Sequence, residues 1–355
     1  MAKPSFEQDS QPKEQRAMAV SVLPVEPPLT PTLKELKSDE SEHIDIGEIM
    51  EELAFADGKT SVATKPIRLQ NRNQLNDLTG KEWIQETNSV WFQKGLGKNH
   101  VHAKIEQQHP APFSFQDIGR LICFFTKQGN KVLDPFCGVA STLKACAVTA
   151  REGIGIELIS KWAELGQQRL REEVPITLSA LPQQIIVGDA RVELTKLKSE
   201  SFDYVVTSPP YWQILAKKPD HKAKRERLSY GYATKYSDSE LDLGNITDYQ
   251  TFLHELGICF KECYRLLRKG KYASIIVSDF RHNSTYQTFH IDVIRIMESH
   301  GFKLKGITVL VQNSKSLYPY GYPYAYVPNI HHQYILNFEK PTGEKKGKND
   351  SAKAD

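Results

Sequence analysis

The chain lacks the features that would place it in a membrane or outside the cell. No run of about 18 apolar residues occurs among its 355 residues, so no membrane-spanning helix is expected. The amino terminus, MAKPSFEQDSQPKEQ, has no apolar stretch typical of a secretory signal. The five cysteines form no CxxC pair, which is typical of reduced thiols rather than of disulfides or a zinc site. These absences predict a soluble cytoplasmic protein with no membrane partner and no metal.

Charge is distributed unevenly along the chain. The net charge is +3, but residues 1–60 contain 6 Lys/Arg and 13 Asp/Glu, a balance of −7, which leaves +10 for residues 61–355. A basic body with an acidic tail is typical of proteins that bind polyanions. An ordinary solvated surface would give the same balance, so charge alone leaves both interpretations open.

Composition divides the chain into four parts. Residues 1–60 are expected to form an acidic, largely disordered tail, with six prolines in 1–34 and one short helix over 43–55. Residues 61–100 contain the first tryptophans and are expected to pack on the core as an N-terminal segment. Residues 101–340 are expected to form the main domain, and 341–355 a second disordered tail.

Strand-like and helical patterns alternate through the main domain. The helical patterns include one starting near Ser114, whose hydroxyl can cap it, and others over 160–172 and 248–267; Cys259 and Cys263 share a face of the last and are expected in the core. The expected strands are 131–133, 153–156, 184–187, 202–206, 271–277, 303–311 and 331–339. Such alternation predicts an α/β fold with a mainly parallel sheet covered on both faces. The last two strands are expected to pair antiparallel at the sheet edge.

The first motif is DPFCGVAST at 134–142, a glycine-containing turn after the first strand of the alternation. Its significance comes from three carboxylates, Asp134, Glu157 and Asp189, which end three successive strands. Glu157 can accept both ribose hydroxyls of a nucleoside, and Asp189 lies within reach of an adenine amino group. Three acids leave little room for phosphate, so S-adenosylmethionine, a cationic nucleoside, fits better than a dinucleotide. The alternative is that these acids are helix caps.

The second motif is TSPPYW at 207–212, again directly after a strand. The exocyclic amine of a base is a poor nucleophile because its lone pair is delocalised into the ring. The Ser208 side chain and the Pro209 carbonyl can accept both N–H bonds and free that lone pair, and Pro209 and Pro210 make the loop stiff. Tyr211 can stack on an extruded base. The alternative is a Pro-Pro turn followed by a packing aromatic residue.

The loop over 207–212 contains no cysteine. Methylation at the 5-carbon of cytosine requires a thiolate nucleophile in the loop. Tyr211 follows Pro210, and the nearest cysteine, Cys137, lies in the first motif. That chemistry is therefore excluded.

In HPAPFS, DPFCG, GIEL, VGDA, TSPPYW and HHQYILNFEK the chain resembles the DNA amino-methyltransferases, which methylate cytosine N4 or adenine N6. The resemblance covers about residues 101–340 and implies a class I, Rossmann-like fold with seven strands, the last antiparallel, and a prokaryotic, phage or mobile-element origin. By this resemblance, the expected cofactor-binding residues are Phe113, Ser114, Asp134, Pro135, Phe136, Gly138, Ser141, Thr142, Glu157 and Asp189. The expected catalytic residues are Ser208, Pro209, Pro210 and Tyr211. Ala140 stands where the family commonly has glycine.

The resemblance also implies a substrate and its partners. Serine at the head of the catalytic string is similar to the cytosine-directed members, so double-stranded DNA methylated at cytosine N4 is expected, with adenine N6 as the alternative. A cognate restriction endonuclease is a possible partner. A tRNA guanine methyltransferase and a non-catalytic subunit that reads DNA are rival interpretations.

Two segments are candidates for contact with DNA. The insertion 213–247 carries six basic residues that can neutralise phosphates: Lys217, Lys218, Lys222, Lys224, Arg225 and Arg227. The segment YPYGYPYAY at 318–326 has five tyrosines, which can stack on bases or pack on the protein's own body.

Overall fold

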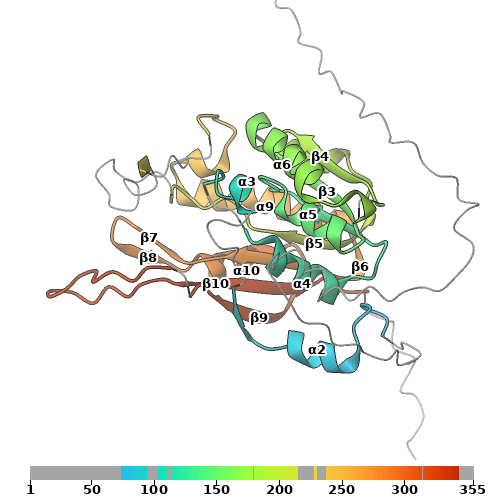
Figure 1. Ribbon diagram of the computed structural model, residues 1–355. Helices are drawn as coiled ribbons and strands as arrows, with labels where there is room; N and C mark the ends of the chain where they lie inside the picture. The colour runs from blue at the N-terminus through green and yellow to red at the C-terminus, as the bar shows by residue number, and fades with distance from the viewer. Residues whose placement is uncertain are drawn as a thin grey trace, which may run out of the picture. The chain divides into compact units, whose positions relative to one another are not determined.

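Eight strands form the central sheet of the computed structural model, in the order β1-β9-β10-β6-β5-β2-β3-β4 (Figure 1). The residues described are 73–93, 102–110, 113–178, 180–214, 228–229, 237–313 and 315–343. All of them belong to the compact unit formed by residues 45–355. The expected disordered tail, the helix over 43–55, the six basic residues of the insertion and residues 344–355 lie outside the described residues.

The seven predicted strands are all present, in chain order. They are β2 (Lys131–Asp134), β3 (Glu152–Glu157), β4 (Gln183–Val187), β5 (Phe202–Thr207), β6 (Leu267–Val277), β9 (Lys303–Val311) and β10 (His332–Glu339). Every neighbouring pair is parallel except those that involve β10, which runs antiparallel to both β6 and β9. The prediction of a Rossmann-like α/β fold with an antiparallel last strand is confirmed.

The prediction that β9 and β10 form the sheet edge is wrong. They do pair, but β10 inserts between β6 and β9, and an unpredicted strand β1 (Val90–Phe92) pairs with β9 on its other side. Ile335, Leu336 and Phe338 of β10 are all fully buried, so this strand is covered on both faces and belongs in the sheet interior. Sequence adjacency predicted the pairing, but it does not determine which member lies inside.

Helices cover both faces of the sheet. One layer of core packs helix α4 (Phe115–Phe125) and helix α5 (Ser141–Val148) on the sheet, with α6 (Ser160–Glu173) beside α5. The opposite core packs α7 (Ala190–Glu193), α9 (Tyr249–Leu266) and α10 (Phe289–Ser299). Smaller elements are helix α2 (Gly80–Glu86), helix α3 (Ala103–Glu106), the 3-10 turns Ile176–Leu178, Leu194–Lys196 and Leu243–Asn245, and the hairpin of β7 (Phe280–His282) and β8 (Thr285–Gln287). No helix within the described ranges is long and apolar enough to cross a membrane.

The predicted helix starts are close to those observed. Helix α9 begins where Asp248 accepts a hydrogen bond from the Thr251 amide at 2.7 Å, and its Cys259 and Cys263 are fully buried, as expected. Helix α4 begins at Phe115 after Ser114, but the Ser114 side chain makes no capping hydrogen bond. The predicted role of that hydroxyl is therefore wrong, although the position is right.

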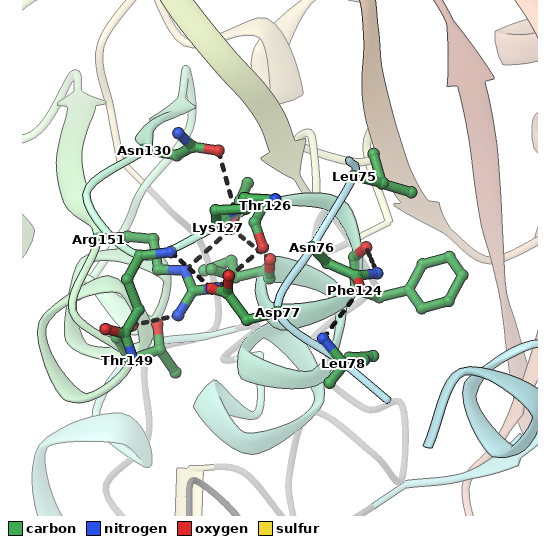
Figure 2. Close-up of polar contacts among 12 residues, drawn as sticks. Leu75, Asn76, Asp77, Leu78, Phe124, Thr126, Lys127, Asn130, Thr149 and Arg151 are labelled. Carbon is green, nitrogen blue, oxygen red and sulfur yellow. Dashed lines mark hydrogen bonds and ion pairs between the residues drawn. The ribbon is translucent and has the colours of Figure 1, made fainter. Parts of the chain in front are cut away.

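The segment before β1 is tied to the amino-terminal edge of the sheet by polar contacts (Figure 2). Asn76 is fully buried, and its amide donates to the Phe124 carbonyl at the end of α4. Lys127 donates to the Asn73 carbonyl at 2.7 Å, and Asp77 accepts from the Gln128 amide at 2.9 Å. The described part of residues 61–100 thus packs on the core through its backbone as well as its side chains.

Arg151 is the buried centre of the same region (Figure 2). Its guanidinium donates to the carbonyls of Thr126 and Thr149, which follow the last turns of α4 and α5, and lies 3.5 Å from Asp77. A cation at helix carboxyl termini satisfies carbonyls that have no partner within the helix and complements the helix dipoles. One side chain therefore terminates two helices that pack on the sheet.

We expect Arg151→Met to lower the free energy of unfolding by about 3–5 kcal/mol, because it removes the partner of several buried polar groups. Chemical denaturation measures this directly. Arg295 is a matched control, since its side chain is 76% exposed and pairs with Asp292 at 3.5 Å; Arg295→Met should cost less than about 1 kcal/mol. Equal losses in the two variants would contradict the role of Arg151.

Candidate functional site

The two sequence motifs meet at the carboxyl edge of the sheet. Strands β2 and β5 are neighbours, although β3 and β4 separate them in the chain and lie on the other side of β2. The order of connection reverses at this point, and in open α/β sheets ligands bind in the crevice there. The loops that follow β2, β3, β4 and β5 all open into this crevice.

A single pocket occupies the crevice, with about 1040 Å³ of empty space counting its open mouth. Of the predicted cofactor and catalytic residues, all but Ser114 line it: Phe113, Asp134, Pro135, Phe136, Gly138, Ser141, Thr142, Glu157, Asp189, Ser208, Pro209, Pro210 and Tyr211. Ser114 is buried and is not part of the lining. The structure thus gathers segments that are up to about a hundred residues apart in the sequence.

Asp134 holds the two motifs together. One carboxylate oxygen accepts from the Phe136 amide at 3.0 Å and from the Thr207 hydroxyl at 2.6 Å, and the other accepts from the Thr142 hydroxyl at 2.5 Å. Burial raises the pKa of Asp134 above its usual range, while these hydrogen bonds oppose the rise. Since Thr207 directly precedes Ser208, Asp134 connects the turn after β2 to the start of the second loop.

Glu157 faces the turn from the end of β3. Its two carboxylate oxygens accept from the amides of Gly138 and Ile159, each at 2.9 Å. Burial raises the pKa of Glu157 to about 7, although these two hydrogen bonds lower it. Each oxygen retains lone-pair capacity for a ligand hydroxyl. Glu157 does not cap α6, because the residue at the helix start is Ile159.

Asp189 has partners that the sequence did not indicate. It caps α7 by accepting from the Arg191 amide at 2.9 Å, so the helix-cap alternative is correct for this residue. It also pairs with the Arg191 guanidinium at 2.6 Å, and Arg191 in turn contacts Glu255 of α9 at 2.6 Å. The Asp189 carboxylate is therefore held in a fixed orientation at the pocket wall.

The turn after β2 has close backbone packing. Gly138 and Ala140 both adopt positive φ, 51° and 62° respectively. A side chain at Gly138 would meet the His109 ring 3.2 Å away, and one at Gly155 of β3 would lie 2.6 Å from Cys137. Glycine is required at these two close approaches. At 140 the chain uses alanine in the left-handed region, so the departure from glycine changes local strain but leaves the turn in place.

Buried ionic contacts support the turn from behind. Arg169 of α6 is fully buried and donates to the Ser141 hydroxyl at 2.8 Å and the Val139 carbonyl at 3.3 Å. It also pairs with Glu173 at 3.0 Å, and Lys144 of α5 pairs with the same carboxylate at 2.6 Å. Burial lowers the pKa of Lys144 to about 8. These contacts fix the turn against α5 and α6.

The loop after β5 is stiff and largely buried. Pro209 is buried and Ser208 is half-buried at the pocket. Tyr211 is 8% exposed: its ring packs against Phe280 and Phe289, and its hydroxyl accepts from the Gln333 amide at 3.4 Å. Burial raises the pKa of Tyr211, so the hydroxyl stays protonated at neutral pH. The packing of Tyr211 is settled in this structure, while its stacking on a base stays a prediction.

Several pocket residues were missed from the sequence. His109 and Trp162 line the pocket with their rings edge to face, 5.1 Å between centroids. His109 begins the HPAPFS string. Trp162 follows Glu157, the acid at the end of β3, by five residues, and this nearby aromatic residue could have indicated a contact with the ligand. Leu241, Asp242 and Leu243 also line the pocket.

These last three residues belong to the insertion expected over 213–247. The Trp212 indole donates to the Ile246 carbonyl at 2.8 Å, and Arg191 donates to the Leu241 carbonyl at 3.0 Å. The described end of the insertion, 237–247, therefore forms a wall of the pocket. Nothing in the sequence pattern marked this segment as part of the pocket.

Residues 38–168 match the model of a family described as DNA methylase, of the N6/N4 methyltransferase type. The match includes the turn after β2 and Glu157 and ends before the loop after β5. The type II methyltransferase M.MthZI of Methanothermobacter thermautotrophicus is 26% identical over 129 residues, 36% of this chain and 36% of that protein. The type II methyltransferase M.MjaI of Methanocaldococcus jannaschii is 32% identical over 97 residues, 26% of this chain and 31% of that protein. The matches thus span about a third of the length of these curated relatives.

Solved structures with a similar chain include two proteins of Thermus thermophilus. A candidate DNA modification methylase of this bacterium, complexed with S-adenosyl-L-methionine, is 28% identical, covers 46% of this chain and 57% of its own, and has a TM-score of 0.31. TrmN is 17% identical, covers 70% of this chain and 54% of its own, and has a TM-score of 0.42.

The strain at Ala140 can be measured. Ala140→Gly loses a buried methyl group and gains unfolded-state entropy, each worth about 1 kcal/mol, but it relieves about 1–2 kcal/mol of left-handed strain. We expect the free energy of unfolding to change by less than about 1 kcal/mol. Ala145→Gly, at an equally buried site inside α5, has no strain to relieve and should cost about 2 kcal/mol. Equal costs at the two sites, measured by denaturation, would show that Ala140 is unstrained.

Proposed function

We propose that this chain, whose residues 38–168 match the DNA methylase family, transfers the methyl group of S-adenosylmethionine to an exocyclic amine of an extruded base in double-stranded DNA. The observation that carries this proposal is the pocket shared by two groups of residues. Glu157 and Asp189 line it together with Ser208 and Tyr211. A nucleoside-binding wall and an amine-binding loop thus face the same space.

The carboxylates and aromatic rings that line the pocket fit S-adenosylmethionine. In this proposal, Glu157 would accept from the ribose hydroxyls, and the oriented Asp189 carboxylate would accept from the adenine amine. The aromatic rings of Trp162 and His109 offer an apolar surface for the adenine face. The sulfonium and ammonium groups favour an acid-rich wall, and the sulfonium supplies the methyl group when the cofactor is bound.

The loop after β5 would prepare the amine for attack. The Ser208 hydroxyl and the Pro209 carbonyl are the proposed acceptors for its two N–H bonds, which would turn the nitrogen toward tetrahedral geometry. The nitrogen lone pair would then be free to attack the methyl carbon while the sulfur–carbon bond breaks, and one N–H proton would leave to solvent. Asp134 and the two prolines hold the loop in place, and such positioning supplies much of the rate.

We propose cytosine N4 as the target, because serine at position 208 is similar to the cytosine-directed members of the family. Adenine N6 is the alternative, since the same two acceptors would serve either amine. The type II names of the relatives support site-specific methylation, with a cognate restriction endonuclease as the proposed partner.

The reaction is tested by expressing the chain in a host without DNA modification and digesting that DNA for mass spectrometry. We expect N4-methylcytosine, and we expect Ser208→Ala to lower turnover about tenfold to a hundredfold, as the loss of a hydrogen bond in the transition state would. Ser201→Ala, in the turn before β5 and away from the pocket lining, is the control. N6-methyladenine would change only the base, whereas 5-methylcytosine or unmodified DNA would overturn the proposal.

The raised pKa of Glu157 predicts a pH dependence of cofactor binding. The ionised carboxylate is the better acceptor for two ribose hydroxyls, so affinity for S-adenosylmethionine should be highest above pH 7 and fall as the pH drops through about 7. Calorimetry should show this for the wild type, and a weaker, flat profile for Glu157→Gln. Glu152→Gln, at the other end of β3 and paired with Lys131 at 2.7 Å, should retain the wild-type profile. A flat profile in the wild type would remove Glu157 from the cofactor contacts.

A further inference from the structure

The connection between β9 and β10 carries an unusual set of exposed rings. Residues 315–331 of this connection extend well beyond the sheet (Figure 1). At their tip, Tyr322, Tyr324 and Tyr326 are 81%, 94% and 91% exposed, and Tyr320 and Leu317 are exposed as well. The alternative that the tyrosines pack on the protein's own body is therefore wrong for these four, while Tyr318 at the base of the loop is half-buried. Large apolar rings clustered in solvent indicate a contact surface.

The tip is folded by its own hydrogen bonds. Asn329 closes its base by accepting from the Tyr318 amide at 3.0 Å and donating to the Tyr318 carbonyl at 2.8 Å. At the turn, the amides of Tyr324 and Ala325 both donate to the Gly321 carbonyl at 2.7 Å. Gly321 has φ +77°, and a side chain there would meet the Ala325 carbonyl. Tyrosines presented on an ordered loop bind a partner at low cost in conformational entropy.

The topology places this loop at the same sheet edge as the pocket. Val277, the last residue of β6, pairs with Tyr334 near the start of β10, and β6 runs parallel to β5. The loop therefore leaves the sheet from the edge where Ser208 lies. Gln333, the second residue of β10, donates a hydrogen bond to the Tyr211 hydroxyl, which connects the strand at the base of the loop to the proposed catalytic tyrosine.

The charge of the loop selects the kind of partner. Residues 312–338 contain no Asp or Glu, whereas Lys315, His331 and His332 provide cationic or neutral groups. The adjacent hairpin of β7 and β8 adds Arg281. Tyrosine hydroxyls donate to phosphates, and tyrosine rings stack on bases and sugars. An aromatic, acid-free loop beside the pocket fits a polyanion that offers sugars and base edges for ring contact better than it fits another protein.

We propose that the tip 318–326 contacts duplex DNA flanking the extruded nucleotide, through the rings of Tyr322, Tyr324 and Tyr326. This inference rests on the proposed function for its partner, but it concerns a surface outside the pocket. The tip would contribute part of the affinity for DNA through contacts of its rings, and this part would not depend on charge.

The test measures binding of the full chain to a fluorescent, mixed-sequence DNA duplex by anisotropy at several salt concentrations. Replacing the three tyrosines by alanine should weaken binding about tenfold to a hundredfold without changing the salt slope, since rings release no counterions. Replacing them by phenylalanine retains the rings and should leave most of the affinity. Lys315→Ala should instead reduce the salt slope. Ile176→Ala, at an exposed apolar residue before β4, is the control and should change neither quantity.

The outcomes separate this inference from the proposed function. Unchanged DNA affinity in the alanine variant would overturn the inference, and if that variant instead lost self-association, the tip would be a protein contact. Equal losses in the alanine and phenylalanine variants would also overturn it, because hydroxyls rather than rings would then carry the binding. If the wild type methylated no DNA yet bound it in a tyrosine-dependent manner, the proposed function would fail and the inference would stand.

Discussion

The candidate site depends on the hydrogen bonds that the buried carboxylate of Asp134 accepts. This carboxylate lies where β2 ends, and it accepts hydrogen bonds from the turn that follows, from the first helical turn of α5 and from Thr207 at the end of β5. Two loops that come from neighbouring strands are thereby fixed relative to each other. A buried acid of this kind is costly unless all its acceptors are satisfied, and here three donors satisfy it.

The rest of the turn is held by close packing. Gly155 lets Cys137 lie directly on β3, and Arg169 reaches under the turn to Ser141 and Val139. These contacts leave little freedom for the backbone around Gly138, whose amide is already bound to Glu157. A ligand in the pocket would therefore meet an ordered wall and lose little free energy in arranging it.

The carboxyl edge of the sheet divides into two regions with different chemistry. On the β2–β4 side, carboxylates and the wall over 237–247 surround the pocket. On the β6–β10 side, the loop 312–331 and the β7–β8 hairpin present aromatic and basic groups. Tyr211 lies between the two regions, since its ring packs on Phe280 and its hydroxyl binds Gln333. In the proposed reaction, the acidic region would bind the nucleoside that donates the methyl group, and the aromatic and basic region would face the DNA.

The sequence by itself determined the α/β alternation, the strand ends and the two motifs, because apolar periodicity and strand-end acids are local signals. It also predicted that Cys259 and Cys263 lie in the core, since residues four apart share a helix face. Tertiary structure alone decided that β10 lies inside the sheet, that Arg191 binds Asp189 and that Tyr211 is buried among phenylalanines. It also decided that residues 237–247 wall the pocket and that the tip tyrosines stand in solvent. Each of these depends on contacts between residues far apart in the chain, and no local pattern of residue types encodes which distant partner will cover a given side chain.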